Sequence, residues 1–160
     1  MAKLLIVPGS NKVNREPPEP VSALLRFDGR FVDAVKNNYD QLLDVDVLIL
    51  SPVYGLVAAD EKIGVKEPMK GSWNKFVLED VLSNDEIISQ RNSNLATFHS
   101  VFSKKQYDEV HVNVGYQMSK LIKGFERTVP AGTKITYDRG GLGQKMSQMR
   151  GWIRSNSADA

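Results

Sequence analysis

Four short apolar runs, each ending in a turn that contains glycine or serine, constrain the fold of this 160-residue chain more than any other feature. The runs lie at residues 3–7, 45–50, 107–114 and 132–137. The first two show no alternation of polar and apolar residues, which is typical of buried parallel strands. Segments with a helical spacing of apolar residues lie between the runs. Such alternation of strands and helices indicates a mostly parallel sheet with right-handed crossovers.

The spacing of apolar residues places helices in the connecting segments. A capping box at Ser83 and Glu86 predicts the start of a long helix that ends near residue 103. Residues 58–75 contain too many glycines, prolines and acids to hold a period and predict a loop. The other predicted helices cover residues 29–43, residues 118–125 and a last segment that carries Met146, Met149 and Ile153 on one face.

We therefore predict an α/β fold, a three-layer sandwich with a mostly parallel sheet of about four strands and helices on both faces. The length corresponds to one domain, placed at residues 1–154, with a polar tail at 155–160. No apolar run approaches the roughly 20 residues of a membrane helix, so no membrane association is expected. The chain has no cysteine, which excludes a cysteine nucleophile and fits a cytoplasmic protein.

Charge is distributed unevenly along the chain. Residues 1–80 carry 10 bases and 12 acids, whereas residues 81–160 carry 11 bases and 7 acids. A basic C-terminal part attracts phosphate groups or nucleic acid. A set of solvated helix faces gives the same pattern.

The carboxyl ends of the four predicted strands define the candidate site. Ligands bind beyond these ends in an open parallel sheet, so the turns that follow the strands are expected at one edge. Neither a catalytic residue nor a metal site nor a cofactor can be assigned from these turns. The candidate ligand-binding residues are Gly9, Ser10, Asn11, Lys12, Ser51, Tyr54, Gly55, Gly115, Tyr116, Arg139, Gly140, Gly141, Gly143 and Gln144.

The glycine-rich turn at residues 139–144 is the best candidate for binding an anion. Its glycines allow successive N–H groups to point at one ligand, and a helix N-terminus follows directly. Arg139 adds a side chain that binds phosphate or carboxylate through two hydrogen bonds. The turn matches neither a dinucleotide fingerprint nor a Walker A loop. A tight turn that packs the last helix on the sheet explains the glycines equally well.

Three further positions each have a functional and a structural interpretation. Lys12 could activate Ser10 or bind an anion, or it could be an ordinary solvated lysine. Tyr54 could stack on a base beyond the strand end, or its ring could close the top of the core. His111 lies inside a predicted strand, where a packed or hydrogen-bonded histidine is expected rather than a ligand.

Three of the turns, in this order, resemble a family of small uncharacterised α/β proteins. That family has a Cys-Ser-Lys-Lys turn, a strand ending in Leu-Ser-Ala-Lys-Tyr-Gly-Leu and a Gly-Leu-Gly turn before the last helix. The matching residues here are 7–12, 49–57 and 141–144. The middle segment is also similar to a domain of archaeosine synthases, which modify tRNA, at residues 51–57 and at Gly71-Ser72-Trp73. Both patterns have cysteine where this chain has Gly9.

The resemblance implies a protein that binds a nucleotide, a modified base or a nucleic-acid end at the strand-carboxyl edge, and it extends to an enzyme of base or nucleotide modification. The alternative is a non-catalytic binding or interaction module that has kept the fold and lost the chemistry. Glycine at position 9 favours this alternative. The sequence identifies neither the ligand nor the reaction, the cofactor or the oligomeric state.

Overall fold

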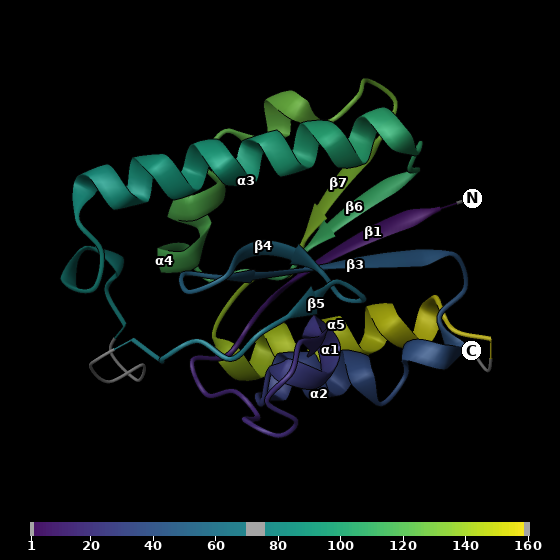
Figure 1. Cartoon of the computed structure of the whole chain (residues 1–160). Coiled ribbons are helices and arrows are strands. Elements are labelled where there is room, and N and C mark those ends of the chain that lie inside the picture. Colours follow the sequence, from purple (N-terminus) through teal and green to yellow (C-terminus); the bar gives the residue numbers. More distant parts are fainter. Residues whose placement is uncertain (1, 70–75, 159–160) are drawn as a thin grey trace.

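The computed structural model describes residues 2–69 and 76–158 and has a central sheet of five strands (Figure 1). The strands lie in the order β4-β3-β1-β6-β7, and every neighbouring pair is parallel except β3 with β4. The structure therefore confirms an α/β fold with a mostly parallel sheet. The five strands are β1 (Lys3–Pro8), β3 (Val45–Ser51), β4 (Gly55–Ala58), β6 (Glu109–Val112) and β7 (Lys134–Tyr137).

The sheet has five strands instead of about four because the chain reverses directly after β3. Gly55 has a φ of 76°, a conformation that glycine adopts at low cost. The Ser51 hydroxyl oxygen accepts hydrogen bonds from the N–H groups of Val53 at 3.0 Å and Tyr54 at 3.1 Å. The reversal places β4 antiparallel against β3 as an edge strand, where the sequence indicated only a turn.

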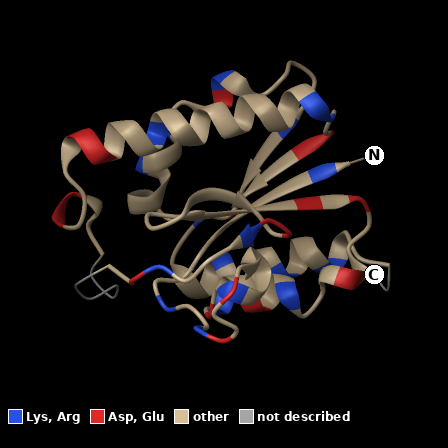
Figure 2. Ribbon diagram, viewed as in Figure 1, with Lys and Arg blue, Asp and Glu red and all other residues tan. Residues whose placement is uncertain are grey.

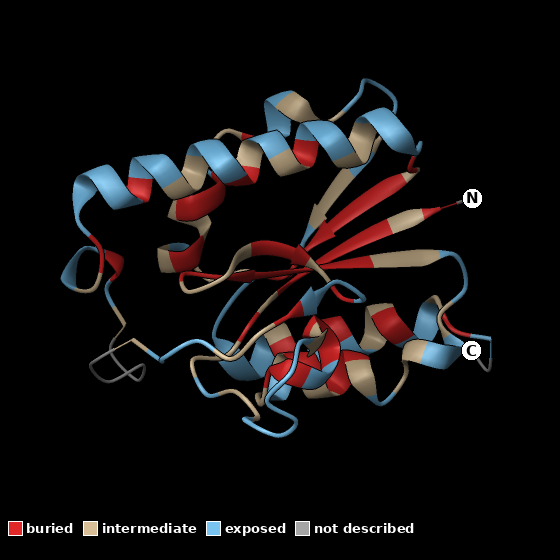
Figure 3. Cartoon of the chain, in the orientation of Figure 1, coloured by how far each residue is buried: buried red, intermediate tan, exposed pale blue. Residues whose placement is uncertain are grey.

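Helices cover both faces of the sheet (Figure 1). Along β1, Leu4 and Ile6 join one apolar cluster and Leu5 and Val7 join the other, because successive side chains of a strand point to opposite faces. Figure 3 shows the buried strands between helices whose outer surfaces are exposed. One face carries α3 (Asn84–Lys104), α4 (Tyr116–Ser119), η4 (Lys120–Ile122) and η5 (Phe125–Thr128), and the other carries α1 (Ala23–Arg26), α2 (Arg30–Lys36) and α5 (Leu142–Ser155).

Several short elements complete the chain. Two of them, β2 and β5, pair antiparallel and form a small second sheet, and β5 lies within the segment 58–75 that was expected to be a loop. The short elements are β2 (Val21–Ser22), η1 (Tyr39–Gln41), β5 (Lys62–Ile63) and η3 (Leu78–Asp80). Among the described residues, no helix combines the length and the apolar character needed to cross a membrane.

The predicted helix starts are more accurate than the predicted lengths. At the start of α3, the Ser83 hydroxyl accepts from the Glu86 N–H at 3.2 Å, and the Glu86 carboxylate accepts from the Ser83 N–H at 3.0 Å, which confirms the capping box. The predicted helix at 29–43 is divided into α2 and η1. The predicted helix at 118–125 is divided among α4, η4 and η5, and the left-handed φ of 89° at Gly124 separates η4 from η5.

The C-terminal segment is more integrated than the predicted polar tail at 155–160. Ser155 still belongs to α5, and Ser157 is buried, with its hydroxyl donating to the Ile153 carbonyl at 2.6 Å. The backbone pairs with the chain beside η1, since the Ala158 N–H donates to the Gln41 carbonyl at 2.8 Å. The residues up to 158 therefore pack as part of the domain.

Candidate functional site

The four turns that follow the parallel strands lie at one edge of the sheet, as predicted. The register of β1 with β3 and β6, and of β6 with β7, makes all four strands run in the same direction. Their carboxyl ends therefore point the same way. The side chains of these turns do not form one pocket, however, because they surround separate hollows.

The largest of these hollows lies beyond the ends of β6 and β7 and measures about 870 Å³. We call it the carboxyl-edge cavity. Of the predicted site residues, Tyr116, Arg139 and Gly140 line it. The structure adds residues that the predicted site lacked, chiefly Lys123 and Lys145. The cavity therefore combines aromatic rings with several cationic side chains.

One cation of the carboxyl-edge cavity is neutralised within the protein. The Lys120 ammonium donates to both carboxylate oxygens of Glu79, at 2.8 Å and 3.0 Å, and lies 5.1 Å from the centre of the Tyr116 ring. The hydrogen bond from Lys120 lowers the pKa of the Glu79 carboxyl below its ordinary value. Lys120 thus lies against the ring of Tyr116, a residue that is 76% exposed and can contact a ligand.

Three other cations of the cavity are available to an anion. The Lys123 and Lys145 side chains make no hydrogen bond or ion pair with any described residue. An ideal Cβ on Gly115 would lie 3.8 Å from the Lys145 ammonium, which places that charge over the start of α4. The Arg139 guanidinium lies 5.1 Å from the centre of the Tyr137 ring, a cation–π contact.

Tyr137 is a neutral hydrogen-bond donor in this cavity. Its hydroxyl donates to the Glu126 carboxylate at 3.1 Å. Burial of the ring, followed by the negative charge of Glu126 and this hydrogen bond, raises the pKa of Tyr137 to about 12. The ring therefore offers an apolar face and no negative charge at neutral pH.

The glycine-rich turn at 139–144 is already satisfied by glutamine side chains at two of its N–H groups. Gln144 accepts from the Gly141 N–H at 3.0 Å, and Gln148 accepts from the Arg139 N–H at 2.9 Å. Gly140 has a φ of 99°, which disfavours any side chain at that position. The tight turn therefore explains why glycine and glutamine stand at positions 140 and 144. Arg139 is the group of this turn that can reach an anion.

A smaller hollow of about 260 Å³ lies beyond β1, and we call it the Gly9 hollow. Gly9, Ser10, Arg30, Leu142 and Met146 are among its lining residues. It brings the first predicted turn beside the first residue of α5. The last predicted turn thus contacts both hollows, through Gly140 on one side and Leu142 on the other.

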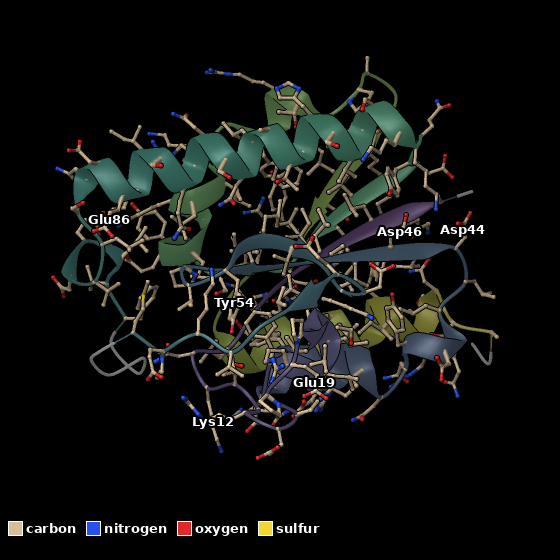
Figure 4. All side chains as sticks on the ribbon, in the orientation of Figure 1. Lys12, Glu19, Asp44, Asp46, Tyr54 and Glu86 are labelled. Atoms are coloured by element: carbon tan, nitrogen blue, oxygen red, sulfur yellow. The ribbon has the colours of Figure 1, made fainter. Side chains whose placement is uncertain are left out.

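The polar side chains of the first turn hold the loop. The Ser10 hydroxyl donates to the Lys12 carbonyl at 2.6 Å and accepts from the Asp28 N–H at 3.0 Å. Lys12 forms an ion pair with Asp28 at 3.1 Å, its side chain is 81% exposed, and Figure 4 places it at the outer edge of the molecule, away from Tyr54. The Asn11 amide is bonded on both sides to the backbone of Met69.

The surroundings of Gly9 leave no room for a side chain at this position. An ideal Cβ at this position would lie 2.7 Å and 2.9 Å from two ring carbons of Phe27 and 3.1 Å from a methyl group of Ile49. Both Phe27 and Ile49 are fully buried. The volume that a cysteine would need is therefore occupied by the Phe27 ring.

Tyr54 has a structural role that uses both its ring and its hydroxyl. The ring packs edge-on against Phe27, with the ring centres 5.5 Å apart. The hydroxyl donates to the Gly64 carbonyl at 2.7 Å and accepts from the Lys66 N–H at 2.9 Å. Tyr54 and Gly55 line a hollow of about 180 Å³ beside α3, apart from the carboxyl-edge cavity. A stacking role for Tyr54 stays a prediction.

Sequence reasoning missed a buried polar network beneath α5. The Thr136 hydroxyl donates to the Glu109 carboxylate, His111 contacts Thr136 through Nδ1 at 2.6 Å and Asp138 through Nε2 at 2.9 Å, and the Asn113 amide donates to Asp138 at 2.7 Å. The signal was present in the sequence: Glu109, His111 and Asn113 alternate along one predicted strand, and Thr136 and Asp138 keep the same spacing at the end of the next.

The His111 imidazole holds the network together. Its two ring nitrogens lie within hydrogen-bond distance of the Thr136 hydroxyl and the Asp138 carboxylate. The imidazole is further held by stacking on Trp152, with ring centres 4.8 Å apart. Asp138 borders the carboxyl-edge cavity and therefore connects the network to it.

Comparisons with known proteins give a fold and no function. No family model matches the chain, and no curated protein sequence matches it. The chain is similar to the crystal structure of AF0587, a protein of unknown function, with a TM-score of 0.52 and 11% identity over 94% of this chain. This chain spans 44% of the length of that protein. At such low identity the likeness shows the fold alone.

The resemblance to archaeosine synthases therefore stays a prediction. Part of it, Gly71-Ser72-Trp73, lies outside the described residues. The described part of it, residues 51–57, forms the end of β3 and the reversal into β4. The turn after β1 and the turn before α5 carry the resemblance to the small uncharacterised α/β family, which also stays a prediction.

Proposed function

We propose that this protein binds a nucleotide, a modified base or the end of a nucleic-acid strand in the carboxyl-edge cavity. One observation carries the proposal: exposed or half-buried tyrosine residues line the same hollow as cations that have no hydrogen-bond or ion-pair partner among the described residues. Tyr116 can stack on a base, and stacking tolerates different bases. Lys123, Lys145 and Arg139 can bind phosphate oxygens through charge-assisted hydrogen bonds. We also propose that the protein is cytoplasmic, that its fold is a three-layer sandwich, and that it is related to the archaeosine synthase domain.

The second candidate function is a binding module without the chemistry of its relatives. The filled space at Gly9 supports it, because Phe27 occupies the volume where the resembling families carry a cysteine. In this candidate the cavity binds a ligand and no residue at position 9 takes part in a reaction. The two candidates share the binding step and differ only in whether the ligand is altered.

Binding is tested on the full chain by a thermal-shift screen over nucleoside monophosphates, deazapurine bases and short RNAs, followed by titration calorimetry. Arg139→Ala is expected to weaken the binding of a phosphorylated ligand by about 1.5–3 kcal/mol, and raised salt should weaken this binding further. Tyr116→Ala should weaken phosphorylated and unphosphorylated ligands alike. Lys104→Ala, an exposed change at the far end of α3, is the control.

Catalysis is tested separately from binding. A ligand recovered chemically unchanged after incubation with the full chain favours the binding module. A ligand that is bound with the same affinity by wild type, Arg139→Ala and Tyr116→Ala would refute the cavity as its site.

A further inference from the structure

A further hollow, apart from those described above, lies between α2 and α5 and measures about 570 Å³. We call it the α2–α5 groove. Arg30 of α2 and Arg150 and Arg154 of α5 line it, together with the buried apolar side chains of Ala34 and Ile153. Figure 2 shows Lys and Arg residues over the helices on this face of the sheet.

The guanidinium groups of Arg30, Arg150 and Arg154 are unpaired within the described part of the chain. None of them makes a hydrogen bond or ion pair with a residue in the described part of the chain. The acid that lines the groove, Asp33, forms an ion pair with Lys36 at 3.4 Å. The groove therefore presents positive charge that the protein itself leaves uncompensated.

The arrangement places like charges side by side on α5. Arg150 and Arg154 are four residues apart on α5, a spacing at which like charges destabilise a helix. A surface selected only for solubility mixes the two signs of charge. Guanidinium groups bind phosphate through two parallel hydrogen bonds, so bound phosphates would remove the repulsion.

The groove continues toward the candidate site. Arg30 lines both the α2–α5 groove and the Gly9 hollow. Leu142 lines the Gly9 hollow, and Gly140, two residues before it, lines the carboxyl-edge cavity. Neighbouring lining residues thus connect the three hollows along one side of α5.

We propose that the α2–α5 groove binds the sugar–phosphate backbone of a single-stranded nucleic acid whose end lies in the carboxyl-edge cavity. The inference rests on the proposed function and narrows its ligand from a nucleotide to a strand. Arg150 and Arg154 lie about 6 Å apart along the helix axis, a separation comparable with that of neighbouring phosphates in one strand.

The test compares two probes on the full chain. A fluorescein-labelled single-stranded RNA of about 12 nucleotides, within the usual site sizes of strand-binding proteins, is titrated by anisotropy, and uridine monophosphate is titrated by calorimetry. Arg150→Gln with Arg154→Gln is expected to weaken RNA about tenfold or more and to reduce the slope of log affinity against log salt by about 1–2. Uridine monophosphate should bind this variant as it binds wild type.

The matched control removes two charges elsewhere. Lys62→Gln with Lys104→Gln changes two exposed lysines that line none of the hollows, and it should bind RNA like wild type. Equal weakening by this control would show a general charge effect and overturn the groove. Unchanged RNA affinity in the arginine variant would overturn it as well.

The two proposals fail in different ways. One outcome is that Arg139→Ala weakens the binding of both probes while the double variant Arg150→Gln with Arg154→Gln binds both like wild type. In that case the carboxyl-edge cavity is supported as the binding site and the groove is refuted. If the arginine variant weakens RNA and Arg139→Ala leaves both probes unchanged, the groove binds RNA and the cavity is refuted. A third outcome concerns pyrophosphate. If pyrophosphate shifts the melting temperature through Arg150 and Arg154 and does not compete with RNA, the groove binds a small phosphate compound. The proposal that a nucleic-acid strand occupies the groove is then refuted.

Discussion

At the residue scale, position 9 shows how the packing of one ring decides which chemistry is available. Gly9 follows β1 and faces the Phe27 ring, which belongs to the apolar cluster beneath α2 and α5. Phe27 is in turn held by Tyr54, whose ring packs against its edge. A side chain at position 9 would have to displace this pair from the core.

Gly9→Cys is therefore expected to lower the free energy of unfolding by about 1–3 kcal/mol, as overpacking of a core does. Equilibrium urea denaturation measures the loss. Phe27→Leu in the same chain removes the ring carbons that Cβ would meet, so the double variant should lose less than the sum of the single losses. Gly64→Cys is the control, since an ideal Cβ there has no neighbour within 4 Å. Wild-type stability of Gly9→Cys would contradict the packing argument.

Tyr54 distinguishes a packing role from a ligand role. Tyr54→Phe removes two hydrogen bonds to the loop that follows β5 and should cost about 0.5–1.5 kcal/mol of unfolding free energy. Tyr54→Ala also removes the contact with Phe27 and should cost up to about 3 kcal/mol, less than for a fully buried ring. Thermal and urea denaturation measure both. If Tyr54→Ala keeps its stability and loses ligand affinity, the stacking role predicted from the sequence is the correct one.

At the scale of elements, β6, β7 and α5 enclose polar groups where a sheet and a helix ordinarily pack through apolar side chains. The alternation along β6 places Val110 and Val112 toward α3 and places Glu109 and His111 toward α5. Trp152 of α5 completes the enclosure, with its indole N–H donating to Glu109 at 3.1 Å. Glu109 and His111 thus each have partners from both β7 and α5.

Glu109 makes this enclosure sensitive to acid. Burial alone would raise the pKa of its carboxyl, but hydrogen bonds from Thr136 and Trp152 and the charges of Lys134 and Lys3 lower the pKa below the ordinary 4.5. At pH values near the pKa of this carboxyl, the folded chain therefore binds fewer protons than the unfolded chain. The stabilisation by Glu109 is present above about pH 4.5 and is lost as the pH falls through the lowered pKa.

Glu109→Gln should accordingly be less stable than wild type at neutral pH and should lose less stability on acidification. Urea denaturation at a series of pH values between neutrality and about pH 3 measures both effects. Glu19→Gln removes the same charge from an exposed position and is expected to keep the pH dependence of wild type. An unchanged acid response of Glu109→Gln would contradict the role of this carboxylate.

At the scale of the whole molecule, the order of the strands decides which predicted residues meet. The sequence was sufficient for the four parallel strands and for the common edge of their turns, because apolar runs and Gly or Ser turns are local signals. It could not show that β6 and β7 lie next to each other at one side of the sheet, since strand order depends on long-range pairing. For that reason Lys123 and Lys145 were missed, and Ser10 and Tyr54 were grouped with residues of other hollows.

The two apolar clusters on opposite faces of the sheet form one folding unit, because the backbone of β1 and β3 carries side chains into both. Ile122 belongs to the cluster beneath α3, and Ile153 belongs to the cluster beneath α2 and α5; each is 2% exposed. Ile122→Val and Ile153→Val should each cost about 0.5–1.5 kcal/mol. Since the sheet separates the two sites, the double variant should lose the sum to within about 0.5 kcal/mol. Circular dichroism and tryptophan fluorescence should report one common urea transition for all three variants, whereas two separate transitions would mean that the layers unfold independently.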